Sequence, residues 1–219
     1  LESLVELDLG DNKLTSLPVE LGNLIRLESL LLSFNQLTSV PAELGRLTSL
    51  KKLFLGKNQL TTFPAWIGEL TSLEVLALAG NKLKHVPVWI WSRLTLKSLD
   101  LSDNWLIRVP PPPQELGNLR WLNELALAGN SLKKVPGWIR NLTSLRVLWL
   151  NNTKLTSLPA WIGELTSLKQ LDLSENLLAS VPEELGDLRL LTDLDLTRNT
   201  MLTSMPTRID QLRTRGCNV

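Results

Sequence analysis

The decapeptide PAWIGELTSL occurs twice in this chain of 219 residues, at 64–73 and again at 159–168. The two copies lie 95 residues apart, which equals four periods of 23 residues plus three further residues. Self-similarity at a period of about 20 to 50 residues is the signature of a tandem repeat array. The spacing therefore predicts a solenoid of 23-residue turns, with a three-residue insertion between the two copies.

Aligned on the decapeptide, the chain follows one template, L-x-x-L-x-L-x-x-N-x-L, which runs on to a proline. Nine turns share it, so we expect a single domain over 1–219 that begins within a repeat and ends in a degenerate segment, 207–219. Eight turns carry asparagine and one carries threonine at the same position: Asn12, Asn35, Asn58, Asn81, Asn104, Asn130, Thr153, Asn176 and Asn199.

Each part of the template predicts a local structure. Leucine alternates with variable residues at L-x-L, as at Leu30 and Leu32, which predicts a short parallel strand with one buried face. The segment after the proline is too short for a long helix, so we expect one 3₁₀ or α turn per repeat, such as 66–70. Glycine recurs four residues after the proline, and we expect a positive φ there: Gly22, Gly45, Gly68, Gly117, Gly163 and Gly186.

The recurring asparagine has a structural interpretation. An inward amide supplies donors and an acceptor to backbone groups that leave the strand without ladder partners. A hydroxyl replaces only part of this bonding, so we expect Thr153 to cost about 1 kcal/mol locally.

This template resembles leucine-rich repeats, and the 23-residue turn with L-P-x-x-[IL]-G-x-L resembles their typical intracellular subclass, seen in Ras-pathway scaffolds and plant Ras-group proteins. The resemblance implies an α/β solenoid, a right-handed superhelix of about nine turns with a parallel sheet on its concave side and short 3₁₀ or α turns and loops on its convex side. It also implies binding of a protein partner on the concave sheet, and no catalysis or cofactor. The G-x-I-P segment of the plant extracellular subclass is absent.

Composition excludes several other classes. The formal net charge is +1, so no strong field favours nucleic acid or an anionic membrane, and no apolar run is long enough for membrane insertion. Cys217 is the only cysteine, which excludes a disulfide framework and fits a cytoplasmic protein, with a secreted effector as the alternative. His85 is the only histidine, and we interpret it as a surface residue. No zinc site, nucleophile elbow or phosphate loop is present in the sequence.

The variable strand positions are where binding is expected. Leu31, Phe34 and Phe54 would form an exposed apolar group beside Lys52 and Lys57, and Trp149 is a second candidate anchor. Packing across adjacent strands is the alternative role for these side chains. Acidic positions would meet a basic partner surface or simply form a solvated face: Asp100, Asp103, Asp172 and Asp195.

The outer side carries a second set of candidates, the tryptophans two residues after the proline: Trp66, Trp89, Trp138 and Trp161. They either pack over the neighbouring turn or form a convex strip for self-association. Four prolines, Pro110–Pro113, predict an extended bulge that either binds a partner or is a tolerated insertion. The uncapped first turn is another route to a homo-oligomer. The sequence thus predicts a protein-interaction module, with a self-associating scaffold or the recognition domain of a larger signalling enzyme or effector as alternatives.

Overall fold

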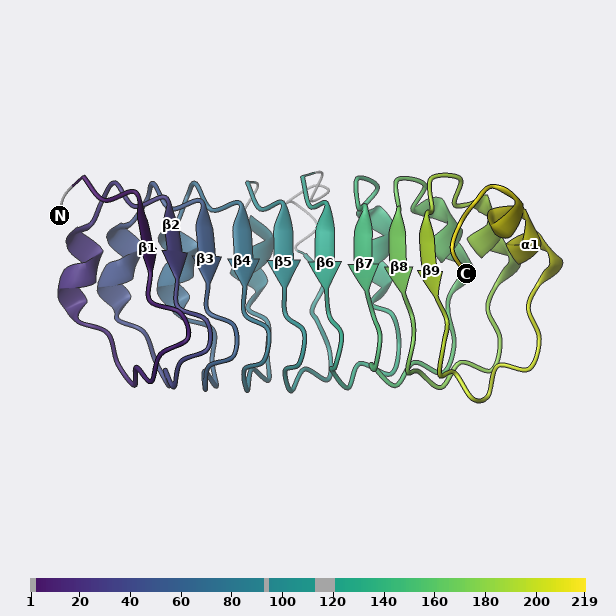
Figure 1. Cartoon of the computed structure of the whole chain (residues 1–219), viewed down its shortest axis with the longest axis horizontal. Helices are drawn as coiled ribbons and strands as arrows, with labels where there is room; N and C mark the ends of the chain where they lie inside the picture. The colour runs from purple at the N-terminus through teal and green to yellow at the C-terminus, as the bar shows by residue number, and fades with distance from the viewer. Residues whose placement is uncertain (1–2, 93–94, 113–120) are drawn as a thin grey trace.

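The computed structural model describes residues 3–92, 95–112 and 121–219. Within these residues nine parallel strands lie side by side in one sheet, in the order in which they occur along the chain (Figure 1). This confirms the predicted α/β solenoid. Each strand has three residues: β1 (Glu6–Asp8), β2 (Ser29–Leu31), β3 (Lys52–Phe54), β4 (Val75–Ala77), β5 (Ser98–Asp100), β6 (Glu124–Ala126), β7 (Val147–Trp149), β8 (Gln170–Asp172) and β9 (Asp193–Asp195).

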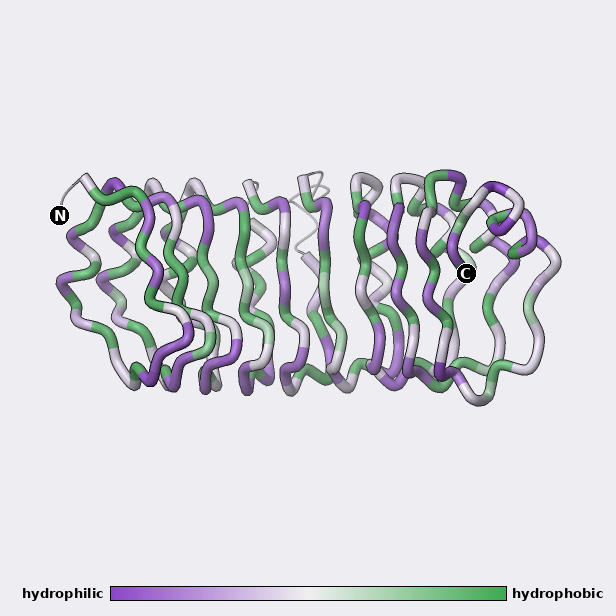
Figure 2. The backbone as a smooth tube through the Cα atoms, viewed as in Figure 1, coloured by the Kyte–Doolittle hydropathy of each residue, from purple (hydrophilic) through white to green (hydrophobic). Residues whose placement is uncertain are grey.

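The strand register places equivalent residues of every turn beside one another. The central leucine of each strand, such as Leu30 or Leu53, points into the core, and the residues before and after it face outward. Polar and apolar residues alternate along β9, whereas β4 is apolar throughout, as the colours of Figure 2 show. Asp100 pairs with Ala126, 26 residues later rather than 23, so the inserted residues are accommodated without shifting the sheet. The predicted bulge extends beyond the described residues at Pro113.

The other side of the solenoid consists of short 3₁₀ helices, as predicted. The proline before each helix fixes φ for the first turn, as Pro64 does with φ −65°. Seven such helices, each of five residues, lie within the described parts of the chain: η1 (Val19–Asn23), η2 (Ala42–Arg46), η3 (Ala65–Glu69), η4 (Val88–Ser92), η6 (Gly137–Asn141), η7 (Ala160–Glu164) and η8 (Glu183–Asp187).

Glycine recurs in these 3₁₀ helices for a different reason from the predicted one. None of the five described ones has a positive φ, so that prediction was wrong, and Gly117 lies outside the described residues. A Cβ on Gly22 would lie 2.3 Å from the carbonyl oxygen of Glu43, and one on Gly163 would lie 2.3 Å from that of Glu184. Glycine is needed at Gly22, Gly163 and Gly186 because the next turn packs directly against them, whereas at Gly68 a Cβ would make only ordinary contact.

The asparagine column connects successive turns, as predicted. The amide nitrogen of Asn58 donates to the carbonyls of Leu32 (2.9 Å) and Leu55 (3.1 Å), and its oxygen accepts from the N–H of Leu37 (3.0 Å). Asn104 makes the equivalent bonds. Each amide therefore satisfies buried backbone groups of its own turn and of the turn before it.

Thr153 interrupts the column in the expected way. Its hydroxyl donates to the carbonyl of Leu150 in its own turn (2.6 Å) but does not reach the carbonyl of Leu127 in the preceding turn. In the other turns the asparagine oxygen accepts the N–H that corresponds to that of Leu132. Here the Leu132 N–H has no hydrogen bond within the described residues. The joint between the turns of β6 and β7 thus lacks the side-chain bonds that the other joints have, although a backbone bond from Lys133 N–H to the carbonyl of Thr153 (3.0 Å) crosses it.

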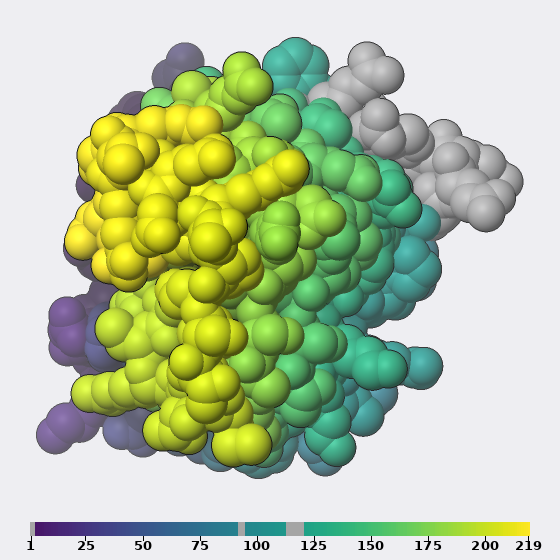
Figure 3. All heavy atoms as spheres, turned by 90° about the vertical axis from the view of Figure 1, so that its right-hand side faces the viewer, coloured from purple at the N-terminus to yellow at the C-terminus, as the bar shows by residue number. Residues whose placement is uncertain are grey.

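The two ends of the solenoid differ. At the C-terminal end, α1 (Thr207–Thr214) and the residues after it cover part of the last turn (Figure 3). Asn218 pairs with the edge of β9, since Leu194 N–H donates to its carbonyl and its own N–H donates to that of Thr192, both at 2.8 Å. At the N-terminal end most leucines of the first turn, such as Leu7 and Leu9, are only partly buried.

We expect Asn104→Ala to lower the free energy of unfolding by about 3 kcal/mol, because it leaves buried carbonyls and the Leu83 N–H without partners. Urea denaturation followed by circular dichroism measures this. Asn141→Ala, at an exposed position, is the matched control and should change stability by less than about 0.5 kcal/mol. Equal losses in the two variants would contradict the role of the column.

Cys217 provides a probe of the C-terminal cover. The thiol is buried, and this burial, followed by the charge of Asp193, raises its pKa above the ordinary value. We expect iodoacetamide at mildly alkaline pH to label Cys217 at least about tenfold more slowly in the folded protein than in urea. Mass spectrometry over time measures the two rates, and equal rates would mean that the cover does not form in solution.

Candidate functional site

The sheet face presents two rows of outward side chains, which are the rows expected from the sequence. The register places Phe54 beside Ala77, Ala77 beside Asp100, Asp100 beside Ala126 and Ala126 beside Trp149. Across β3–β7 this row therefore reads aromatic, alanine, aspartate, alanine, aromatic. At about 4.8 Å per strand, the two aromatic residues stand roughly 19 Å apart.

A shallow pocket of about 160 Å³ lies between these two aromatic side chains. Phe54 and Trp149 line its two ends, and the small Ala77 and Ala126 lower the surface between them. Asp100 lies in the middle of the pocket lining. The other row contributes Val75, Ser98, Glu124 and Val147. The pocket thus combines apolar ends with two carboxylates, from Asp100 and Glu124.

The aspartates of the sheet face also have a local role that the sequence analysis missed. One carboxylate oxygen of Asp100 accepts the backbone N–H of Ser102, two residues later, at 2.9 Å. Asp8, Asp172 and Asp195 do the same for the N–H groups two residues after them. This bond satisfies a donor at the end of the strand. The second oxygen of Asp100 has no hydrogen bond within the described residues, so it is free to accept one from a ligand.

The position before each asparagine has a left-handed backbone in every turn, with φ between 50° and 68°. Glycine occupies it at Gly80 and Gly129, on either side of Asp103. A Cβ on Gly129 would lie 2.1 Å from the carboxylate of Asp103, and one on Gly80 would lie 2.5 Å from Cδ of Lys57. These glycines leave room for the two charged side chains, and Lys57 Nζ lies 3.6 Å from Asp103 Oδ2.

Phe34 occupies the same left-handed position, with φ 59°, and 55% of its surface is exposed. A bulky side chain is unfavourable in this region of φ and ψ. Neither the backbone conformation nor burial of the side chain explains why this position carries phenylalanine.

The other predicted sheet-face residues are distributed along the array. Leu31 is half-buried on β2, and Lys52 and Lys57 are exposed. Phe54, Asp100 and Trp149 meet in the pocket, whereas Leu31 and Phe34 do not line it. Asp172 and Asp195 lie outside it on β8 and β9. The pocket itself was missed, although the small Ala77 and Ala126 between larger neighbours signal a depression.

Along the edge where the strands begin, charges compensate each other. Lys51 pairs with Glu28 and Lys97 pairs with Glu74, both at 2.8 Å. The hydrogen bond from Lys97 holds the pKa of the Glu74 carboxyl below its ordinary value. This edge therefore offers little net charge to a partner over β2–β5.

The convex tryptophans are mostly directed inward. Trp66 and Trp138 are buried, and Trp89 and Trp161 are half-buried against the core. The ring of Trp138 packs against that of Trp91 with centroids 4.6 Å apart, and its indole N–H donates to the carbonyl of Val109 at 3.2 Å. Burial leaves little of Trp66 and Trp138 for a partner, so a convex contact stays a prediction for Trp89 and Trp161.

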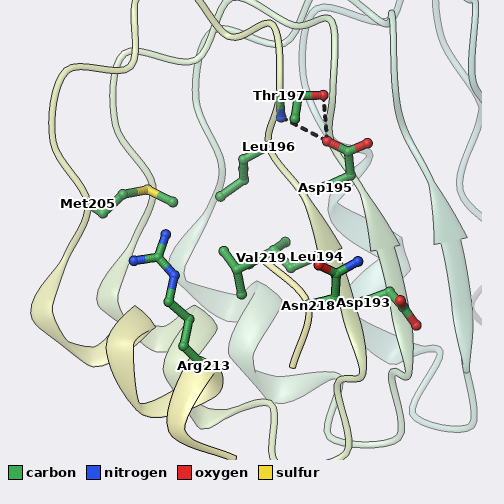
Figure 4. A pocket seen from close by; sticks show the side chains of 9 residues that line it. All are labelled: Asp193, Leu194, Asp195, Leu196, Thr197, Met205, Arg213, Asn218 and Val219. Carbon is green, nitrogen blue, oxygen red and sulfur yellow. Dashed lines mark hydrogen bonds between the residues drawn. The ribbon is translucent and has the colours of Figure 1, made fainter. Parts of the chain in front are cut away.

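A second pocket, of about 370 Å³, opens at the C-terminal end of the array (Figure 4). Met205 and Arg213 face Leu196 across it. Asp195, on its rim, accepts hydrogen bonds from both the N–H and the hydroxyl of Thr197. Arg213 Nη1 lies 3.3 Å from Asp210. This pocket is the opening left between β9 and the residues that cover the end.

The described residues contain no group of three or more His, Cys, Asp or Glu side chains that could hold a metal ion. His85 is exposed. No helix within these residues has the length and apolar character needed to cross a bilayer.

A family model for leucine rich repeats matches residues 25–83, 120–178 and 150–201, and a second leucine-rich-repeat model matches residues 3–24 and 95–119. Together these matches cover most of the chain. It belongs to the leucine-rich-repeat family. The predicted family is thereby confirmed, and the intracellular subclass stays a prediction. Comparison with curated proteins gives no match.

Several solved leucine-rich-repeat structures are similar to the chain. A leucine-rich-repeat protein of Leptospira interrogans is 34% identical, with a TM-score of 0.66, over 96% of this chain and 64% of that one. The ectodomain of the receptor kinase GASSHO1/SCHENGEN3 of Arabidopsis thaliana, solved with CASPARIAN STRIP INTEGRITY FACTOR 2, is 35% identical, with a TM-score of 0.82, over 96% of this chain and 26% of that one.

The Arabidopsis receptor kinase HAESA, solved with the peptide hormone IDA and the co-receptor SERK1, is 36% identical, with a TM-score of 0.76. The match covers 90% of this chain and 34% of that one. The present chain thus spans less than two thirds of each of these solved chains. Leucine-rich-repeat domains of this kind are interaction domains that are typically non-catalytic.

We expect Phe34→Asn to raise the free energy of unfolding by about 0.5 kcal/mol, because asparagine tolerates the left-handed backbone better than phenylalanine does. Phe34→Leu keeps the unfavourable backbone and is the control, with no expected gain. Chemical denaturation compares the three proteins. Destabilisation by Phe34→Asn would mean that packing of the ring outweighs its backbone cost.

Proposed function

We propose that this chain is a non-catalytic interaction module that binds an extended segment of a partner protein across β3–β7 of its sheet face. The pocket between Phe54 and Trp149 is the observation that carries this proposal. Its ends are apolar, its middle is acidic, and its length of roughly 19 Å matches about six residues of extended chain.

The aromatic residues favour binding over a structural role. Trp149 keeps 43% of its surface exposed, since its neighbours on the adjacent strands are the small Ala126 and the polar Asp172. Partly exposed aromatic side chains rimmed by charge are typical of residues that dominate binding energy. The similar solved structures include a receptor in complex with a peptide hormone, which supports a peptide-like partner for this chain too.

Charge indicates what the partner segment contains. Asp100 keeps one unpaired carboxylate oxygen, and Glu124 on the adjacent strand is exposed. An arginine or lysine of the partner would place its cation between these carboxylates and its neighbouring apolar residues against Phe54 and Trp149. Lys52 and Lys57 would meet an acidic residue further along the same segment.

Self-association through the convex tryptophans is less well supported, because Trp66 and Trp138 are buried. Membership of a larger signalling enzyme or effector is compatible with the proposal, since the pocket would then be its recognition site. A cytoplasmic location remains an expectation that rests on the single cysteine.

Selection of a random peptide library against the wild-type protein tests the pocket. We expect the selected peptides to carry arginine or lysine beside apolar residues, and we expect Trp149→Ala and Asp100→Asn each to weaken their binding at least about tenfold by calorimetry. Asp172→Asn is the matched control, because Asp172 bonds its own strand end as Asp100 does but lies outside the pocket. Peptides that bind all four proteins equally would contradict this site.

A further inference from the structure

The segments that follow the asparagines form a strip along one flank of the solenoid, beyond the strand arrowheads in Figure 1. In this segment buried leucines alternate with outward residues, so that Lys82 and Lys84 flank the buried Leu83. Successive segments lie side by side, since Trp105 N–H donates to the carbonyl of Leu83 and Ser131 N–H donates to that of Leu106, both at 2.9 Å.

Over the turns of β4–β7 this strip, which we call the basic flank, is strongly cationic. The equivalent segments 82–87, 105–110, 131–136 and 154–159 contain no aspartate or glutamate. They carry six cations that make no ion pair within the described residues: Lys82, Lys84, Arg108, Lys133, Lys134 and Lys154.

Two large apolar side chains project from the middle of the basic flank. Trp105 is 54% exposed and Ile107 is 65% exposed, on either side of the buried Leu106. Lys84 Nζ lies 5.8 Å from the centre of the Trp105 ring. The equivalent positions in the turn of β3 carry Gln59 and Thr61, so the repeat itself does not require apolar residues there.

The net charge of the whole chain, +1, does not reveal this local group of cations. The chain has 23 lysines and arginines and 22 aspartates and glutamates, so removal of the six cations leaves 17 against 22, a net charge of −5. Six unpaired cations thus lie together on one flank, while the rest of the chain carries an acidic excess.

We propose that the basic flank docks peripherally on an anionic phospholipid surface, with Trp105 and Ile107 inserted among the headgroups and the six cations around them bound to lipid phosphates and carboxylates. Tryptophan is favoured at the headgroup level of a bilayer, and basic residues near an anionic surface add to the attraction. An aliphatic side chain beside the tryptophan fits a lipid surface better than it fits nucleic acid, where stacking and phosphate contacts dominate.

The arrangement of the basic flank also fits a surface rather than a pocket. Its residues come from four successive turns, so they form a row along the array that many headgroups can contact at once. The sheet-face pocket lies on different residues and remains open in this orientation, so membrane docking and peptide binding do not depend on each other.

Vesicle flotation tests the proposal on the intact protein. We expect binding to vesicles of phosphatidylcholine with phosphatidylserine, and little binding to phosphatidylcholine alone or in high salt. The double variant Lys133→Glu/Lys134→Glu should lower the partition coefficient at least about tenfold, and Trp105→Ser should lower it about fivefold. Trp149→Ser, which removes an exposed tryptophan from the sheet face, is the matched control and should bind vesicles as the wild type does.

Thermal unfolding of every variant checks that these exposed substitutions leave the fold intact. Absence of vesicle binding by the wild type would overturn the proposal, as would equal binding to neutral and anionic vesicles. Binding to polyglutamate or to single-stranded DNA without binding to vesicles would also overturn it, and would assign the basic flank to an acidic protein or a nucleic acid.

Discussion

The side-chain amide of the stacked asparagines is the interaction on which the whole solenoid depends. Each strand has three residues, so each turn makes few hydrogen bonds within the sheet. Beyond the strand, the backbone carbonyls point into the interior and need other hydrogen-bond donors. Asn81 donates to two of these, from Leu55 and Leu78, and accepts the N–H of Leu60. With the polar backbone satisfied in this way, apolar side chains, mostly leucines, fill the remaining space.

Much of the fold could be predicted from the sequence because its determinants repeat. The period, the inward leucines, the outward rows and the partial substitution by Thr153 all follow from residue type and spacing. The glycine prediction failed because it considered only the backbone of glycine itself, whereas the constraint comes from the next turn, as at Gly22. The left-handed column was missed because it includes Phe34 and Lys57, although Gly80 and Gly129 indicate it.

The candidate site was predictable as a set of positions but not as a shape. Phe54, Asp100 and Trp149 stand at variable strand positions, yet the pocket arises because Ala77 and Ala126 between them are small. The convex tryptophans share their position with glutamate, so sequence alone could not show that Trp138 turns inward to contact Trp91. The basic flank was not predicted, because the net charge is a sum over the whole chain and does not show where cations lie. Only the stacking of the turns brings Lys84, Trp105 and Lys133 together.

Thr153 has a consequence for how the molecule responds to force. Its hydroxyl does not reach the preceding turn, and η6 and η7 pack less closely against each other than η7 and η8 do. A pull applied along the long axis therefore meets fewer side-chain hydrogen bonds between β6 and β7 than between β7 and β8, where Asn176 donates to the carbonyl of Leu150. A single hydroxyl in place of an amide thus weakens one joint of the array under load.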